Sequence, residues 1–397
     1  MGESSTGRGR HQVVGTLDEF LRARIRELIE EVLQEEVTAS LGPRRHARGE
    51  GRGGYRHGSR ARTLTLTAGT VAITVPRARL QHPDGAWSEW RSALLPRRRR
   101  LSSAVETAVV RTYLAGSNTR RIQAALAPLL GASPLSKSSV SRLVQRLEDA
   151  FDGWRRQDLT PTPMVYLYLD AVYPRVRCAG RVSVLPVLVA LGITPSGDKV
   201  VLALQTSGVE TGAAWAELVT DLVNRGLRAP QLVITDGNRG LQQALTRLWP
   251  GVAHQRCVVH KQRNVVSAAP RHVQAEVRRD FQAVVYAETR EAAHTARARF
   301  ITTWRKRAPR AVASLLEAQD DLLAFHAFPA SQHRSLRSTN VIERLNEEFR
   351  RRIKTQTACP SETSVLVLFY SLVASGTVRM KKLSGWVDLP RPTRRAA

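Results

Sequence analysis

Three widely spaced carboxylates stand in contexts that are unusual for surface acids. Asp170 ends the apolar run at residues 164–169, and Asp236 ends a second apolar run at 232–235. Glu343 opens a stretch with helical character. Two acids at the ends of buried strands and a third on a helix can meet at one point of a folded sheet domain. Such a cluster would bind divalent metal ions.

A metal-binding carboxylate cluster suits phosphoryl transfer between nucleic-acid oxygens. Two divalent ions about 3.5–4 Å apart can activate the attacking oxygen and stabilise the leaving oxygen. Mg²⁺ takes hard oxygen ligands and few protein carboxylates, so three acids match its needs. Without metal, the three charges would raise one another's pKa, which argues against a purely structural cluster. We therefore expect two Mg²⁺ ions held by Asp170, Asp236 and Glu343.

Each acid taken alone has an ordinary explanation. Asp170 could simply terminate a strand, and Asp236 with the glycine after it could form a turn. Glu343 could pair with a nearby arginine on a helix surface. The metal-site interpretation therefore depends on the three acids occurring together in the right order of fold elements. Other acids, including Asp280 and Asp321, fall in turns or polar helices and are expected to be solvated.

Cys257 and His260 have the three-residue spacing of a zinc-binding half-site. The chain lacks a convincing second half, so no zinc is expected. A role in supporting the carboxylate site is the favoured interpretation of this pair. A plain buried cysteine is the alternative.

The charge balance points to a polyanionic partner. The 397 residues carry 61 Lys and Arg against 34 Asp and Glu, a formal net charge of +27. Residues 43–100 hold 14 of the basic residues and only three acids. Solubility or a coding bias toward arginine explains part of this excess but not its clustering. Double-stranded DNA is the expected partner, because the phosphate backbone supplies matching charge.

Cysteine content and hydropathy bound the compartment. Three cysteines in 397 residues argue against a disulfide framework and fit a reducing environment. No uncharged apolar stretch of about 18 residues occurs, so no membrane span is expected. We predict a cytoplasmic protein with no membrane partner.

The N-terminal region combines a helix, a basic segment and a small β element. Residues 15–41 have helical apolar spacing, with Thr16 and Glu19 placed as a capping box. The basic stretch 44–56 is too rich in glycine for a regular element and is expected to order on DNA. Alternating residues around 64–75 predict a hairpin that ends near Arg77 and Arg79. This hairpin is either a clamp on the DNA backbone or an ordinary exposed hairpin.

An all-helical stretch follows the run of four arginines at 97–100. Segments 102–115, 118–130 and 136–151 have helical spacing and are separated by short turns. Their arrangement resembles a helix-turn-helix whose last segment opens with small polar and basic residues. A plain helical bundle is the alternative.

The C-terminal half predicts an α/β catalytic core. Three strands (164–177, 181–193 and 199–206) precede two helix–strand units, in the order helix 211–226, strand 231–236, helix 238–249 and strand 253–259. This order is typical of a ribonuclease-H-like mixed sheet. Residues 264–330 are rich in helix formers and fall between the second and third acids, as a helical insertion would. Helices around 340–353 and 361–375 and a basic tail complete the chain.

An ordered set of short segments resembles the Mutator-type transposases of bacterial insertion sequences. The resemblance covers residues 15–385. It is carried by Tyr168-Leu169-Asp170-Ala171 with Val176-Arg177, Thr235-Asp236-Gly237 with Gly240-Leu241, Gln255-Arg256-Cys257 with His260 and Arg263-Asn264, and Thr339-Asn340 with Ile342-Glu343-Arg344-Leu345-Asn346. Gly54-Tyr55-Arg56 and Val75-Pro76-Arg77-Ala78-Arg79 resemble the same family.

The resemblance implies a DDE transposase whose catalytic, metal-binding triad is Asp170, Asp236 and Glu343. It also implies Mg²⁺ with Mn²⁺ as a substitute, a Cys-x-x-His motif at Cys257 and His260, and N-terminal modules that bind terminal inverted repeats. A homodimer or higher assembly on element and target DNA is expected, in the bacterial nucleoid. A DNA-binding regulator with a vestigial core and a nuclease that cuts without joining are the competing hypotheses.

From these patterns we predict five parts and a set of DNA contacts. Residues 1–100 hold the helix, basic segment and β element, 101–160 the helix-turn-helix-like part, and 161–263 the first part of the core. Residues 264–335 form the insertion, and 336–397 the last catalytic helix and tail. The candidate DNA contacts, all basic, are Arg56, Arg77, Arg79, Arg97, Arg98, Arg99, Arg100, Arg120, Arg121, Lys137, Arg142, Arg351 and Arg352.

Overall fold

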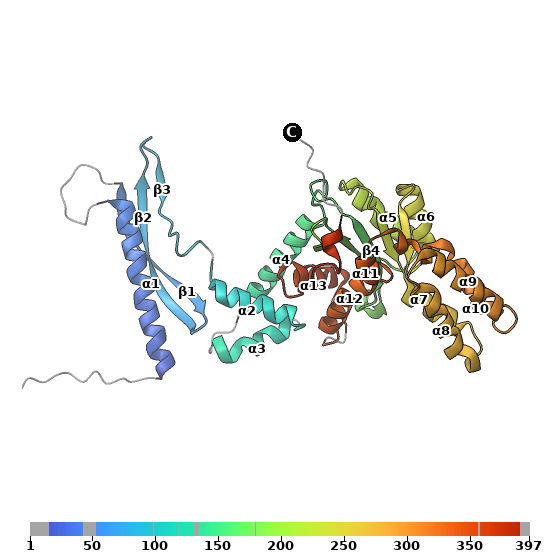
Figure 1. The fold of residues 1–397 in the computed structure, drawn as a ribbon. Coiled ribbons are helices and arrows are strands. Elements are labelled where there is room, and N and C mark those ends of the chain that lie inside the picture. The colour runs from blue at the N-terminus through green and yellow to red at the C-terminus, as the bar shows by residue number, and fades with distance from the viewer. Residues whose placement is uncertain are drawn as a thin grey trace, which may run out of the picture. The chain divides into compact units, whose positions relative to one another are not determined.

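The computed structural model contains two compact units, which are described separately here. The units are Met1–Val144 and Gln145–Ala397 (Figure 1). The structure describes residues 16–42, 53–97, 99–117, 119–130, 135–178, 180–355 and 358–389. The finer division into five parts stays a prediction.

In the first unit, a long helix packs on a three-stranded antiparallel sheet. Helix α1 (Leu17–Leu41) buries the apolar residues of its C-terminal half against strands β1 (Gly54–Leu66) and β2 (Gly69–Gln81), as Figure 1 shows. Strand β3 (Trp87–Glu89) pairs with β2 to complete the order β1-β2-β3. The capping box predicted at Thr16 and Glu19 is confirmed, with both reciprocal bonds present.

The predicted hairpin is confirmed, but its strands are much longer than the alternating pattern suggested. Strand β1 already begins at Gly54, so the prediction that 44–56 forms no regular element is wrong for residues 54–56. Glycine serves here because a Cβ on Gly54 would lie 1.9 Å from the Arg79 carbonyl oxygen. Residues 43–52 of the basic stretch lie outside the described residues.

Three helices follow, close to the predicted bounds. They are α2 (Ser103–Leu114), α3 (Thr119–Leu130) and α4 (Lys137–Trp154), and α4 continues into the second unit.

The second unit is built on a mixed five-stranded sheet. Its order is β10-β9-β4-β7-β8. The strands are β4 (Tyr166–Val172), β7 (Val187–Ile193), β8 (Lys199–Thr206), β9 (Leu232–Thr235) and β10 (Ala253–Arg256). Strands β10, β9 and β4 run parallel, whereas β4, β7 and β8 are antiparallel neighbours.

Two of the predicted strands are wrong as continuous elements. Segment 164–177 divides into β4 and β5 (Arg175–Cys178), and 181–193 divides into β6 (Arg181–Val184) and β7. Strands β5 and β6 form a separate two-stranded sheet. Pro174 and Pro186 stand at the two divisions, and a proline cannot donate to a central ladder.

Helices cover both faces of this sheet. Helices α5 (Gly212–Asn224) and α6 (Arg239–Leu248) pack on one face, where they share an apolar core with Leu167 and Leu169 of β4. Tyr168, which alternates with these leucines, donates to the Ser335 carbonyl oxygen on the other face, near α11 (His333–Leu336). Helix α12 (Asn340–Ile353) also packs on β4, and α13 (Glu362–Ala374) on β8.

The segment predicted as a helical insertion is helical. It contains α7 (Val258–Ser267), α8 (Gln274–Val285), α9 (Arg290–Trp304) and α10 (Pro309–Glu317), followed by 3₁₀ turns at Gln319–Leu322, Ala324–Ala327 and Ala330–Gln332. Two further 3₁₀ turns lie at Arg271–Val273 and Trp386–Asp388. The predicted strand 253–259 is too long, because Cys257 caps α7 and Val258 is already helical. Among the described residues, no helix is long and apolar enough to cross a membrane.

A pair of glycines sets the distance between α5 and α6. A Cβ on Gly240 would lie 2.3 Å from the Gly212 Cα, so neither helix can accept a side chain at this contact.

We expect Gly240→Ala to lower the free energy of unfolding by about 2–3 kcal/mol, because such overpacking forces the backbone to move. Gly153→Ala is the matched control. Its Cβ would meet nothing within 4 Å on α4, so it should stabilise the helix by about 0.5–1 kcal/mol. Urea unfolding of the two variants tests this. Equal stability of the variants would contradict the close glycine contact.

Candidate active site

Asp170 and Asp236 lie at neighbouring positions on parallel strands. The register pairs Tyr166 with Leu232 and Tyr168 with Ile234. Asp170 and Asp236 each follow two residues after the last of these pairs, and the charge of Asp236 acts on Asp170. Both carboxylates therefore emerge at the same edge of the sheet.

Glu343 reaches the same region from the first turn of α12. The Thr339 hydroxyl lies 3.0 Å from Glu343 Oε1 and can donate to it. One turn further along α12, Asn346 Nδ2 donates to Asp170 Oδ2 at 2.8 Å. Asn346 is fully buried, and its Oδ1 has no hydrogen-bond partner among the described residues. The amide of Asn346 thus joins the helix of the third acid to the strand of the first.

Burial and like charge act together on the first two acids. The pKa of Asp170 is raised to about 6, mainly by burial and also by the charges of Asp236 and Glu343, against the lowering effect of the Ala171 backbone N–H and of His260. Burial also raises the pKa of Asp236, with Glu210 adding to the effect. Asp170 therefore interacts electrostatically with both of the other predicted site acids.

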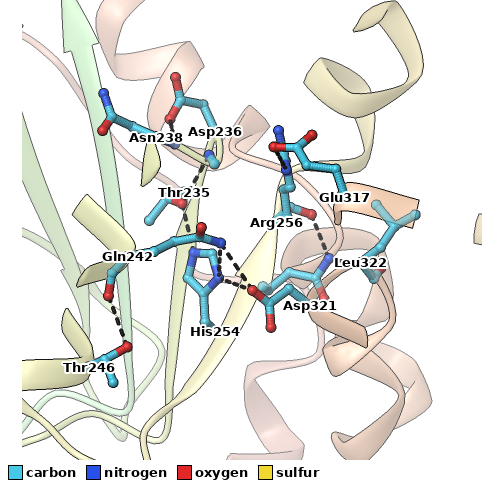
Figure 2. Close-up of polar contacts among 12 residues, drawn as sticks. Thr235, Asp236, Asn238, Gln242, Thr246, His254, Arg256, Glu317, Asp321 and Leu322 are labelled. Carbon is cyan, nitrogen blue, oxygen red and sulfur yellow. Dashed lines mark hydrogen bonds and ion pairs between the residues drawn. The ribbon is translucent and has the colours of Figure 1, made fainter. Parts of the chain in front are cut away.

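The turn that carries Asp236 is held by several hydrogen bonds. The Asn238 N–H donates to Asp236 Oδ1 at 3.2 Å, and Asn238 caps α6 (Figure 2). The Gly237 N–H donates to Thr235 Oγ1 at 3.1 Å. Gly237 adopts φ 97°, and a Cβ there would lie 2.3 Å from Arg256 Nε. Only glycine fits between this turn and the guanidinium group.

Glu317 of the helical insertion gathers buried cations beside this turn. Arg256 Nη1 lies 3.1 Å from Glu317 Oε1, and Lys261 Nζ bonds Oε2. Lys261 is fully buried and Arg256 nearly so. Partial burial would raise the pKa of Glu317, but Lys261 and Arg256 outweigh it and lower this pKa to about 2. The contact fastens α10 to the sheet edge, because separating the partners would leave buried charges uncompensated.

A second polar chain links the insertion to the same turn. His254 Nδ1 lies 2.9 Å from Asp321 Oδ2, and Nε2 lies 2.8 Å from Thr235 Oγ1 (Figure 2). Gln242 of α6 also donates to Asp321, at 3.1 Å. The prediction that Asp321 and Asp280 are merely solvated is wrong, since Asp280 accepts from Trp304 Nε1 at 2.9 Å. Neither partner is near in sequence, so the local pattern carried no signal of these bonds.

Cys257 and His260 lie against Glu343. One donor atom from each of the three residues falls within 4.8 Å of the other two. Burial would raise the pKa of Cys257, but His260 and Thr339 outweigh it and leave this pKa lowered. The Cys257 sulfur raises the pKa of His260 to about 9 against the effect of burial. The pair therefore lies beside one of the three predicted site acids, and its supporting role stays a prediction.

Sequence reasoning missed a fourth carboxylate near Asp236. Glu210 lies in the loop before α5, where Trp215 Nε1 donates to its Oε1 at 3.0 Å and the Tyr173 hydroxyl bonds its Oε2. Both oxygens are therefore occupied, which separates Glu210 from the three acids proposed as ligands. A lone loop glutamate gives no sequence signal of this position.

The predicted DNA contacts are spread along the chain. In the first unit, Arg77 pairs with Glu89 at 3.2 Å, and Arg56 donates to Thr38 of α1 at 2.6 Å. Arg77 and Arg97 line a cavity of about 410 Å³ together with Arg60 and Arg91, which the sequence analysis did not single out.

The other candidates differ in exposure. The exposed side chains are those of Arg79, Arg99, Arg100, Arg121, Arg142 and Arg351, whereas Arg352 is half-buried. Arg351 pairs with Glu348 at 2.6 Å. Arg98 and the side chains of Arg120 and Lys137 lie outside the described residues.

Comparison with known proteins decides the family. The family model described as "Transposase, Mutator family" matches residues 3–381. The chain belongs to the Mutator family of transposases. Family membership implies an enzyme that cleaves and transfers DNA, and it confirms the resemblance found in the sequence.

Several curated members of the Mutator family cover most of the chain. The transposase for insertion sequence element IS905 of Lactococcus lactis subsp. lactis is 34% identical over 352 residues, which is 88% of this chain and 87% of that protein. The transposase for ISRM5 of Rhizobium meliloti is 33% identical over 89% of this chain and 86% of its own. The transposase for IS1081 of Mycobacterium tuberculosis is 32% identical over 91% and 86%, respectively.

The raised pKa of Asp170 predicts a stability cost for the metal-free protein. A carboxyl group whose pKa is raised on folding destabilises the fold as pH rises from its unfolded pKa, near 4, to its folded pKa. The cost is therefore fully present at pH 7.5. We expect Asp170→Asn, in chelator at pH 7.5, to raise the free energy of unfolding by about 1–3 kcal/mol. Asp149→Asn, at an exposed site on α4, should change it by less than about 0.5 kcal/mol.

Chemical denaturation at pH 7.5 and pH 4 measures both effects. The gain from Asp170→Asn should shrink at the lower pH, because the wild-type carboxyl group is then protonated in the folded state. A variant less stable than wild type at pH 7.5 would show that burial does not penalise this carboxylate.

Proposed function

We propose that this Mutator-family transposase binds the terminal inverted repeats of its element and cleaves and joins DNA through a DDE triad of Asp170, Asp236 and Glu343. The observation that carries the proposal is the electrostatic interaction of Asp170 with both Asp236 and Glu343. Asp170 and Asp236 stand two residues beyond the last pair of the β4–β9 register, Tyr168 with Ile234. The bond from Asn346 to Asp170 brings the helix of Glu343 to the same edge. The mixed sheet, with an insertion before the third acid, supports a ribonuclease-H-like core.

The donor set fits Mg²⁺, or Mn²⁺ in its place. The three acids offer only hard oxygen ligands, which Mg²⁺ prefers. Burial raises the pKa values of Asp170 and Asp236, so a divalent cation would stabilise the charged form of these two carboxylates. Two such ions would activate the attacking oxygen and stabilise the leaving oxygen. Asn346 would orient Asp170, and Thr339 would orient Glu343. The Asp236 turn would keep its carboxylate at the sheet edge.

The first unit would supply most of the DNA affinity. The groove lined by Arg60, Arg77, Arg91 and Arg97 concentrates positive charge, and a backbone phosphate is its natural ligand. The helices α2 to α4 would contribute sequence preference through Arg142 and its neighbours. Since cleavage and joining act on two element ends, we propose a homodimer or higher assembly on DNA.

The carboxylate at position 343 should be required for chemistry but not for binding. We expect Glu343→Gln to lower Mg²⁺-dependent cleavage of a labelled duplex carrying the element ends by at least about 10³-fold, because a metal ligand is lost. Binding to the same duplex should change less than about threefold. Glu347→Gln, exposed one turn along α12, is the matched control and should keep wild-type cleavage.

The products of this assay separate the candidate activities. Joined products from wild type support a transposase, whereas cut but unjoined ends would favour a nuclease. Specific binding without cleavage in Mg²⁺ or Mn²⁺ would favour a DNA-binding regulator. Cleavage by Glu343→Gln at the wild-type rate would remove Glu343 from the mechanism.

Arginines of the run at 97–100 should contribute to affinity in a salt-dependent way. We expect Arg97→Ala with Arg100→Ala to weaken binding to every duplex, and to reduce the slope of log K against log salt by about 1–2, since each phosphate contact contributes about 0.9. Arg24→Ala with Arg26→Ala removes the same charge from α1, close to four glutamates, and should leave the slope nearly unchanged. Filter binding between 50 and 200 mM salt measures both slopes. Equal slopes of log K against log salt in the two double variants would show that residues 97–100 do not contact the DNA.

A further inference from the structure

The Cys-x-x-His motif gains a third potential ligand from a distant part of the chain. The sequence argued against zinc because Cys257 and His260 had no second half-site. In the folded chain Glu343 supplies an oxygen, so that one sulfur, one nitrogen and one oxygen atom lie within 4.8 Å of one another. The bond lengths of tetrahedral zinc set such atoms roughly 3.5 Å apart, so small side-chain movements would complete the site.

The surroundings of these three donors suit a bound cation. The Thr339 N–H donates to the Cys257 sulfur at 3.4 Å, and the Thr339 hydroxyl lies 3.3 Å from it. These contacts favour the thiolate, which is the form that binds metal. His260 Nδ1 is buried and has no hydrogen-bond partner among the described residues. Thr339 is an outer group that orients the Cys257 ligand, and such groups are typical of metal sites.

The site also has an entrance. Cys257 is fully buried, but the side chains of His260 and Glu343 keep 30% and 25% of their surface exposed. An ion can therefore approach from the carboxylate side and reach the sulfur last. Cys359 is also buried, but burial raises its pKa to about 11, and it belongs to no such donor group among the described residues. The donor set thus distinguishes Cys257 from an ordinary buried thiol.

We propose that Cys257, His260 and Glu343 form a site for a thiophilic divalent cation of the Zn²⁺ class, and that its occupancy inhibits the enzyme. A sulfur ligand selects such ions over Mg²⁺, which takes oxygen ligands. Because Glu343 belongs to both donor sets, the ion would withdraw this carboxylate from the Mg²⁺ site. The inhibition rests on the proposed function of Glu343, whereas the binding of the ion does not.

Binding is tested without any activity assay. Metal-free full-length protein is titrated with Co²⁺, and the thiolate-to-cobalt charge-transfer absorbance is recorded. We expect wild type and Cys359→Ser to give the band at one equivalent, and Cys257→Ser to lose it. A band that persists in Cys257→Ser, or that is absent from wild type, would overturn the site.

Glu343→Gln keeps the thiol and replaces a partly exposed side chain, so it covers the case in which Cys257→Ser fails to fold. It should weaken Co²⁺ binding at least tenfold, and unchanged binding would remove Glu343 from the site.

Inhibition is tested by adding Zn²⁺ to the Mg²⁺-dependent cleavage assay. Each protein is compared with its own rate without Zn²⁺. We expect wild type and Cys359→Ser to be inhibited at the same Zn²⁺ concentration, and Cys257→Ser to need at least tenfold more. Co²⁺ binding without inhibition by Zn²⁺ would overturn the regulatory role. A Co²⁺ band that follows Cys257, together with no cleavage by any protein, would leave the site standing and count against the proposed function.

Discussion

The fold of the second unit depends on keeping like charges close together at the edge of a sheet. Asp170 and Asp236 stand two residues beyond the last pair of the parallel register of β4 and β9, and their charges interact. Burial contributes most to the raised pKa of Asp170, and the charges of Asp236 and Glu343 add to it. The bond that Asn346 donates to Asp170 stabilises the charged form, and its two ends are 176 residues apart in the sequence. Helix α12 therefore contacts the sheet through Asp170, the group proposed to bind a metal ion, so under that proposal the folding of the site and its chemistry are coupled.

The helical insertion is held by charge rather than by apolar packing alone at this edge. Glu317 engages Arg256 and Lys261, and Asp321 engages His254. Both contacts end next to the turn that carries Asp236: Arg256 packs on Gly237, and His254 bonds Thr235. A movement of the insertion would therefore displace the turn of Asp236 first. Residues that lie between Asp236 and Glu343 in the sequence therefore contact the turn of Asp236.

Local patterns predicted most elements but not the long-range contacts. The capping box at Thr16, the hairpin and the helical insertion follow from residue spacing, which depends on neighbours in sequence. Pro174 and Pro186 were also local signals of where two strands end. The prediction of continuous strands followed the apolar periodicity instead. Glu210 and Glu317 could not be placed, because their roles depend on partners that only the fold brings near. The triad stays a prediction, which rests on strand ends and on the order of fold elements.

A single hydroxyl group connects the two donor sets that share Glu343. Thr339 Oγ1 lies 3.3 Å from the Cys257 sulfur and 3.0 Å from Glu343 Oε1, yet it carries one proton and can donate to only one of them at a time. If the proton points to the sulfur, the thiolate is stabilised and Glu343 is freer to turn toward hard cations. If it points to the carboxylate, Glu343 is held beside Cys257 and His260. Under the two proposals, the position of this proton would favour one donor set over the other, within one turn of α12.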